Sequence, residues 1–272
     1  MSDRYAVMGN PVAHSKSPFI HAHFARQSAQ DLRYEALLVP RDGFARAVRE
    51  FFAAGGKGLN ITVPFKQEAW VLAQVRSRGA ELAGAVNTLR LNAQGVLEGH
   101  NTDGPGLVRD LLHNAGGELR GKRVLVLGAG GATRGIVQPL LAQAPCELVI
   151  ANRTESKARE LAALFAPYGS VIGCGYDALR GQRFDWVLNA TAASLEGTLP
   201  PLPDDLLAAD AWCYDLMYAK DSTIFCRWAQ QHGAARALDG LGMLVEQAAE
   251  AFLLWRGLRP DTGDVLRVLR AS

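Results

Sequence analysis

The stretch RVLVLGAGGATRG, residues 123–135, decides the fold. It opens with an apolar run typical of a buried strand, passes through three glycines within four positions, and continues as a helix. Glycines in such a turn let the backbone approach a pyrophosphate, and the helix N-terminus offers N–H donors and the positive end of a dipole. The stretch therefore predicts a strand–turn–helix unit that binds a dinucleotide, rather than a turn whose glycines serve tight packing alone.

The residues after the next apolar run, 147–151, favour a phosphate. Asn152-Arg153-Thr154 follow that run, and Lys157 stands one helical turn further on. A site for NAD usually has an acid at this strand end, where it accepts from a ribose hydroxyl. A neutral Asn beside a guanidinium instead suits a 2′-phosphate, so we expect the cofactor to be NADP. The glycine fingerprint is imperfect, because Thr133 stands in the place of its third glycine.

Strand-like and helix-like runs alternate along both halves of the chain, which predicts a parallel sheet covered by helices. In the second half we expect strands at 124–127, 148–151, 186–190 and 212–216, and helices at 133–142 and 156–165. Thr154 is the expected N-cap of the second of these helices. In the first half we expect strands at 5–8, 34–39 and 59–63, and helices at 18–27 and 43–53.

The predicted fold is an α/β protein of two domains. The first hundred residues lack a glycine fingerprint, and their loops are rich in small polar residues, which favours a domain that binds a polyhydroxylated molecule. The helix at 243–255 is apolar over most of its surface, so it must be buried and is expected to return to the first domain. We expect a discontinuous substrate domain, residues 1–103 and 241–272, and a Rossmann-type NADP domain, residues 104–240.

The composition argues against several classes of function. The chain has 272 residues, 49% of them hydrophobic and 21% charged, as in soluble globular proteins. A net charge of +2 offers no strong field for nucleic acid or a membrane surface. The four cysteines lie far apart, which argues against a metal site and a disulfide framework and fits a reduced, cytoplasmic setting. We expect no signal peptide and no membrane span, and either a monomer or a homodimer.

Seven motifs, taken together, resemble the shikimate dehydrogenase family over nearly the whole chain. In order they are GNPVAHSKSP (9–18), NITVPFK (60–66), GAVNT (84–88), GHNTD (99–103), GAGGA (128–132), NRT (152–154) and DGLGMLV (239–245). Each motif is weak alone, and the signal lies in their order and spacing. The resemblance implies an oxidoreductase of aromatic amino-acid biosynthesis, the chorismate pathway, that reversibly reduces 3-dehydroshikimate to shikimate with NADPH.

Lys66 and Asp103 match the family's catalytic pair. Lys66 is expected to open a helix, where a lysine opposes the helix dipole. On the residues alone, a solvated surface ammonium is the ordinary interpretation of a lysine, and the resemblance reverses it. It implies that Lys66 donates a proton to the forming alkoxide or stabilises it electrostatically, with Asp103 orienting both.

The resemblance also implies the substrate contacts. Ser15 and Ser17, assisted by Tyr218, are implied to hold the substrate carboxylate, although Ser17 has a second possible role as the cap of a helix beginning at Pro18. Contacts with the carboxylate or the ring hydroxyls are implied for Asn60, Thr62, Asn87 and Gln247. Ordinary roles stay open for these four: turn contacts for the two asparagines, a strand hydroxyl for the threonine and a helix-surface amide for the glutamine.

The implied cofactor contacts come from three places in the second half of the chain. They are Gly128, Ala129, Gly130, Gly131 and Ala132 in the glycine turn, Asn152, Arg153, Thr154 and Lys157 after the next strand, and Leu216 and Gly240 near the nicotinamide. For the last two, strand core and an ordinary turn are the alternatives. His21 and His23 are two apart on a helix and do not share a face, so no metal site is expected.

Two other functions stay open. A quinate/shikimate dehydrogenase of the same superfamily, with relaxed cofactor use, is the nearer; Arg153 and Lys157 argue against an NAD preference, and serine at both 15 and 17 favours shikimate. A non-catalytic dinucleotide sensor on the same fold is the other. Intact Lys66 and Asp103 argue against a sensor, which does not need them. The substrate is expected in a cleft between the domains.

Overall fold

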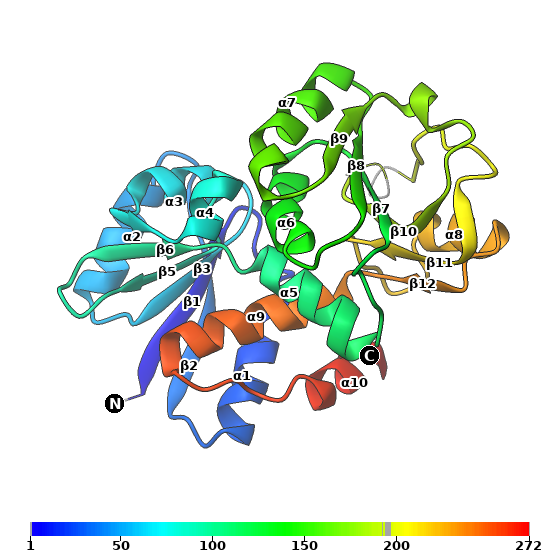
Figure 1. Ribbon diagram of the computed structural model, residues 1–272. Helices are drawn as coiled ribbons and strands as arrows, with labels where there is room; N and C mark the ends of the chain where they lie inside the picture. The colour runs from blue at the N-terminus through cyan, green and yellow to red at the C-terminus, as the bar shows by residue number, and fades with distance from the viewer. Residues whose placement is uncertain (1, 192, 194–196, 272) are drawn as a thin grey trace. The chain divides into compact units, whose positions relative to one another are not determined.

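The computed structural model describes residues 2–191, 193 and 197–271. The chain divides into two compact units: unit 1 is Met1–Gly106 with Leu244–Ser272, and unit 2 is Leu107–Met243. Each unit is built on its own six-stranded sheet with helices around it (Figure 1). The fold is therefore the α/β architecture that the sequence predicts, with the C-terminal helices grouped with the N-terminal half.

Unit 2 contains the glycine turn, and every strand pair described in it is parallel. The strand order β12-β11-β10-β7-β8-β9 reverses between β7 and β10, and the carboxyl ends of such strands are where doubly wound sheets bind ligands. The strands are β7 (Arg123–Leu127), β8 (Glu147–Ala151), β9 (Val171–Cys174), β10 (Phe184–Asn189), β11 (Leu207–Asp215) and β12 (Arg236–Leu238).

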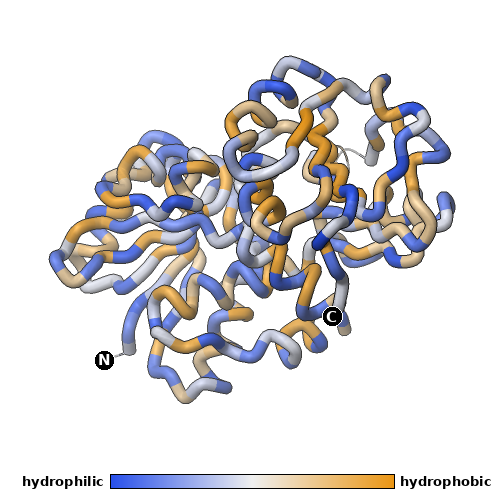
Figure 2. Tube along the Cα trace, in the orientation of Figure 1, coloured by the Kyte–Doolittle hydropathy of each residue, from blue (hydrophilic) through white to orange (hydrophobic). Residues whose placement is uncertain are grey.

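Buried aliphatic runs form the centre of this sheet, and Figure 2 shows them in orange. The flanking helices are α6 (Gly131–Leu141), α7 (Glu155–Phe165) and α8 (Ile224–Gln231). The strands expected at 124–127, 148–151 and 186–190 are confirmed to within two residues, whereas the one expected at 212–216 is the end of a longer strand, β11. The sequence did not predict β9, because Gly173 breaks its apolar pattern. Glycine is needed at this position because α7 packs closely on the strand: a Cβ on Gly173 would lie 2.2 Å from the Ala158 carbonyl oxygen.

Unit 1 has a mixed sheet in the order β2-β1-β3-β5-β6-β4. The first three strands in that order are parallel, whereas β5 runs antiparallel to both of its neighbours. The strands are β1 (Asp3–Gly9), β2 (Leu32–Leu38), β3 (Gly58–Ile61), β4 (Val75–Arg76), β5 (Thr88–Leu91) and β6 (Leu97–His100). The strand expected at 59–63 ends earlier, at Ile61, because a turn closed by Phe65 N and Thr62 O follows it.

The helices of unit 1 cover both faces of its sheet. In Figure 1, α2 (Phe44–Ala53), α3 (Lys66–Leu72) and α4 (Arg78–Ala83) lie over one face, and α1 (Ser17–Gln27) and α9 (Leu241–Arg256) over the other. Buried Ile20 and Phe24 pack against Val245 and Phe252 of α9 and against α10 (Gly263–Ala271). This packing confirms the expected return of the apolar C-terminal helix. No helix among the described residues is both long and apolar enough to cross a membrane.

Candidate functional site

The predicted acid–base pair is formed in unit 1. α3 begins at Lys66 and α5 (Asp103–Arg109) begins at Asp103, so both side chains project from first helical turns. Lys66 Nζ donates to Asp103 Oδ2 at 2.6 Å, and the side chains are 32% and 21% exposed, within reach of a substrate. A helix N-terminus favours an anion and disfavours a cation, so the carboxylate compensates for placing an ammonium there.

Asn87 fixes the other oxygen of that carboxylate. Its Nδ2 donates to Asp103 Oδ1 at 2.9 Å, and its Oδ1 accepts from the backbone N–H of Thr102, also at 2.9 Å. Because a backbone N–H only donates, the amide of Asn87 has one possible orientation. The side chain is buried, so Asp103 is held on both oxygens and the direction of its contact with Lys66 is set.

Asn60 and Thr62 lie on and just after β3. The Asn60 amide is buried; its Nδ2 donates to Asn87 O at 3.2 Å and to Thr88 Oγ1 at 3.1 Å. A turn contact for Asn60 is thus excluded, because the residue lies within the strand. Thr62 donates its backbone N–H to Met8 and lies outside the strand, which excludes a strand-hydroxyl role as well.

Ser15 and Ser17 lie at the start of α1, and the structure excludes the alternative role of Ser17 as the cap of this helix. Ser17 is the first helical residue, and Lys16 is the N-cap without a side-chain hydrogen bond. The Ser15 Oγ accepts the Ser17 backbone N–H at 3.2 Å instead, which leaves the buried Ser17 hydroxyl available for other partners.

The two remaining predicted substrate contacts belong to different units. Gln247 lies on α9 beside α5, since a Cβ on Gly106 would lie 2.6 Å from its backbone nitrogen. Its Nε2 donates to Leu244 O of the same helix at 2.8 Å. Tyr218 lies in unit 2 after β11, and burial raises the pKa of its phenol.

The glycine turn of unit 2 fits a pyrophosphate. Gly128 has a left-handed φ of +98°, and a Cβ there would lie 3.1 Å from Thr191, so glycine is required. Gly130 and Gly131 are exposed with open space around them, and the first N–H groups of α6 lack partners within the helix. Thr133, which replaces the third glycine, donates its hydroxyl to Gly128 O at 2.8 Å and ties the helix to the turn. Ala129 lies in the same turn, and Ala132 lies in the first turn of α6.

The expected phosphate contacts follow β8. Arg153, Thr154 and Lys157 are exposed, and the Asn152 amide is turned onto Thr154 O at 2.9 Å. The nearby acid, Glu155, is paired with Arg159 on the next turn of α7 at 2.6 Å, so its charge is locally balanced. Thr154 is the N-cap residue of α7, as predicted, but its side chain makes no capping hydrogen bond.

Leu216 and Gly240 are brought together after β11 and β12. A Cβ on Gly240 would lie 2.2 Å from the Leu216 carbonyl oxygen, so this close approach requires glycine. The two residues share the carboxyl ends of the strands with the glycine turn, which is where a bound dinucleotide is expected.

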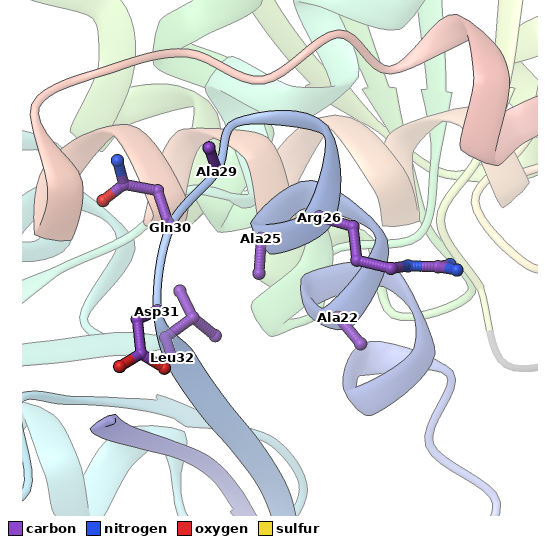
Figure 3. Close-up of a pocket in the computed structure, with 7 residues that line it drawn as sticks. All are labelled: Ala22, Ala25, Arg26, Ala29, Gln30, Asp31 and Leu32. Carbon is purple, nitrogen blue, oxygen red and sulfur yellow. The ribbon is translucent and has the colours of Figure 1, made fainter. Parts of the chain in front are cut away.

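A separate cavity of about 490 Å³ lies at the end of α1 and the start of β2 (Figure 3). It is lined by Ala22, Ala25, Arg26, Ala29, Gln30, Asp31 and Leu32, none of which is a predicted site residue. Over the described part of the chain, no group of three or more His, Cys, Asp or Glu side chains is placed to hold a metal ion.

Three residues in contact with the predicted site were not themselves predicted as site residues. Thr102 orients Asn87, Tyr34 donates to Asn60 Oδ1 at 2.8 Å, and Thr88 lies between Asn60 and Asn87. Tyr34 was expected only as the start of a strand, and the two threonines only as parts of motifs. Their contacts come from the pairing of strands far apart in sequence.

Family models match three parts of the chain: "Shikimate dehydrogenase substrate binding domain" at residues 7–89, "Shikimate / quinate 5-dehydrogenase" at 110–195, and "Shikimate 5'-dehydrogenase C-terminal domain" at 240–270. A curated shikimate dehydrogenase (NADP(+)) from Alkalilimnicola ehrlichii is 61% identical over 99% of both chains. The structure of an Ael1 enzyme from Pseudomonas putida is 50% identical, with a TM-score of 0.94 over 98% of both chains. That of shikimate 5-dehydrogenase from Thermus thermophilus, in complex with NADP(H) and shikimate, is 35% identical, with a TM-score of 0.85 over 99% of both chains. The chain belongs to the shikimate dehydrogenase family.

Proposed function

We propose that the protein catalyses the reversible, NADPH-dependent reduction of 3-dehydroshikimate to shikimate, as a cytoplasmic monomer or homodimer. The observation that carries the proposal is the 2.6 Å contact between Lys66 Nζ and Asp103 Oδ2, with Asn87 on the second carboxylate oxygen. A dinucleotide sensor needs no ammonium held in this way. The family membership supports the same reaction.

Proton transfer to and from the substrate is assigned to residues of unit 1. Reduction of a ketone places negative charge on its oxygen, and the Lys66 ammonium is the group that donates a proton to it. In the reverse direction the neutral amine accepts that proton from the hydroxyl. Asp103 positions the ammonium, and both groups are partly exposed. Residues 1–103 and 241–272 are proposed as the substrate domain.

Neutral donors and acceptors are proposed to hold the substrate. We assign its carboxylate to Ser15, Ser17 and Tyr218, since hydroxyl donors to a charged group make the stronger class of hydrogen bond. Asn60, Thr62, Asn87 and Gln247 are assigned to the carboxylate or the ring hydroxyls. Of these, Asn60 and Asn87 already share one hydrogen-bonded network with Asp103.

The cofactor is assigned to residues 104–240. When bound, NADPH supplies the hydride. The turn from Gly128 to Ala132 would hold the pyrophosphate against the start of α6, and Arg153 and Lys157 would hold the 2′-phosphate, aided by Asn152 and Thr154. Leu216 and Gly240 would lie against the nicotinamide.

Turnover by the purified protein tests the proposal directly. Shikimate and NADP should give NADPH, followed by its absorbance, at a rate well above that with quinate. Comparable rates with quinate would favour the quinate/shikimate alternative. NADP binding without any shikimate-dependent turnover would favour the sensor.

A further inference from the structure

We infer that Tyr34 is a positioning residue of the substrate site, because its phenol begins a directed series of hydrogen bonds that runs through Asn60 and ends on the Lys66–Asp103 pair. The inference rests on the proposed function, since it concerns how that same site is ordered. All residues of this hydrogen-bonded series belong to unit 1.

The donor-to-acceptor direction of these hydrogen bonds is set at the end of the series that contacts Asp103. Asn87 Oδ1 must face the Thr102 N–H, and it also accepts the Thr88 hydroxyl at 3.0 Å. The one proton of Thr88 is thus committed to Asn87. The Thr88 oxygen therefore acts as an acceptor toward its other neighbour, Asn60 Nδ2, at 3.1 Å.

The orientation of Asn60 follows from the same accounting. The backbone carbonyl oxygen of Asn87 and the hydroxyl oxygen of Thr88 both accept from Asn60. The Asn60 Nδ2 therefore faces these two oxygens, and its Oδ1 faces Tyr34. A flipped amide would set Asn60 Oδ1 against the Asn87 carbonyl oxygen. The Tyr34 hydroxyl must then donate its proton to Asn60 Oδ1, at 2.8 Å.

Because the Tyr34 hydroxyl donates its one proton to Asn60, its oxygen can only accept a hydrogen bond from any other partner. Burial raises the pKa of this phenol, and a hydrogen bond from the Ser17 side chain opposes the rise. A substrate carboxylate would compete with Tyr34 for the Ser17 proton, because the hydroxyl rotates. It does not compete for the Tyr34 proton, so loss of the phenol acts mainly through Asn60.

The Tyr34 ring is held in place by His21, one turn after Ser17 on α1. The two rings stack with centroids 4.2 Å apart and planes 6° apart, and His21 is buried among Phe24, Phe252 and Trp255. Burial lowers the pKa of His21 to about 3, so this ring is neutral at neutral pH. The Tyr34 ring is therefore held by stacking against an uncharged ring, and its hydroxyl is held by Asn60.

The test compares Tyr34→Phe with Tyr5→Phe. Tyr5 belongs to the same aromatic cluster, with its ring 4.9 Å from Trp255. Its hydroxyl contacts Arg256 and none of the hydrogen-bonded residues that connect Tyr34 to Asp103. We expect Tyr34→Phe to raise the KM for shikimate roughly tenfold, the scale of a buried acceptor left without its donor, with little change in kcat or in the KM for NADP. Tyr5→Phe should leave the KM for shikimate unchanged. Equal kinetics in the two variants would overturn the inference.

A double-mutant cycle with Asn60→Ala shows whether Tyr34 acts through Asn60. In that background Tyr34→Phe should change the KM for shikimate by less than about twofold, because the pair is coupled. Independent, multiplying effects would refute the assignment. Thr88→Val tests the next link without altering Tyr34: it should raise the same KM, and Thr88→Ser, which keeps the hydroxyl, should restore it. An unmodified protein inactive on shikimate would instead overturn the proposed function and this inference with it.

Discussion

At the scale of the residue, the defining feature of Lys66 is its carboxylate partner, Asp103, at 2.6 Å. Lys66→Ala should lower kcat by about 10²–10⁴-fold, the scale of a lost acid–base group, with a much smaller change in the KM for shikimate. Lys57→Ala, at an exposed position of the same unit, is the matched control and should retain full activity. Near-normal turnover in Lys66→Ala would remove Lys66 from the mechanism.

Arg153 is the residue on which cofactor choice should depend most. It is exposed and offers a planar fork to a phosphate, so each such contact is worth about 1–3 kcal/mol before solvent screening reduces it. Arg153→Ala should weaken NADP binding and leave NAD binding nearly unchanged, as measured by KM for each cofactor. Arg180→Ala, another exposed arginine of unit 2, should change neither. An equal loss of affinity for both cofactors in Arg153→Ala would show that the guanidinium does not recognise the 2′-phosphate.

Sequence predicted the residues whose position follows from a local motif. Lys66 and Asp103 come from short motifs, and the structure joins them with Asn87. Tyr34 was not predicted to contact the site, because its contact with Asn60 spans 26 positions and depends on the pairing of β2, β1 and β3. The roles of the predicted residues in catalysis and binding stay predictions.

At the scale of the element, two helices that both have threonine as the N-cap residue should respond differently to its substitution. Thr223, the N-cap of α8, accepts the Cys226 backbone N–H at 3.1 Å, whereas Thr154 at the start of α7 makes no such bond. Thr223→Ala should lower the free energy of unfolding by about 1 kcal/mol, and Thr154→Ala by much less. Urea unfolding of both variants checks this, and an equal loss in the two would contradict it.

Elements were predictable where their apolar pattern is regular. β7 and β8 are aliphatic and buried at every position after their first residue, as expected of strands buried on both faces. The antiparallel β5 and β6 were not predicted, because four-residue strands with charged positions such as Arg90 and Glu98 lack that pattern. Their pairing follows from the sheet as a whole, and it brings Asn87 next to His100.

At the scale of the whole molecule, the buried His21 should make stability depend on pH. Its pKa in the folded protein is about 3, against 6.5 for an ordinary histidine, so the unfolded chain binds more protons between these values. Stability is therefore fully present above about pH 6.5 and is lost as the pH falls toward 3. The free energy of unfolding relative to His21→Phe should fall by roughly 2–4 kcal/mol from pH 7 to pH 4. A constant difference between the two proteins over this range would show that His21 titrates normally.

The division into two units, with the C-terminal helices grouped with the N-terminal half, was predictable from one observation. The helix at 243–255 is too apolar to be exposed, and α9 packs its Val245 and Phe252 against α1. The exact residues at which the chain passes from one unit to the other, Gly106 and Leu244, were not predictable. Each boundary lies inside a continuous helix, α5 or α9, so no break in the sequence pattern marks it.

The central claim is that this protein oxidises shikimate with NADP. The most direct measurement is the initial rate of shikimate-dependent cofactor reduction by the purified, unmodified protein, with NADP and with NAD over a range of concentrations. Arg153 and Lys157, without an acid at position 152, predict a kcat/KM about 10–1000-fold higher with NADP, and a ratio that shrinks as salt is added. Equal efficiency with the two cofactors, or no shikimate-dependent reduction of either, would contradict the account.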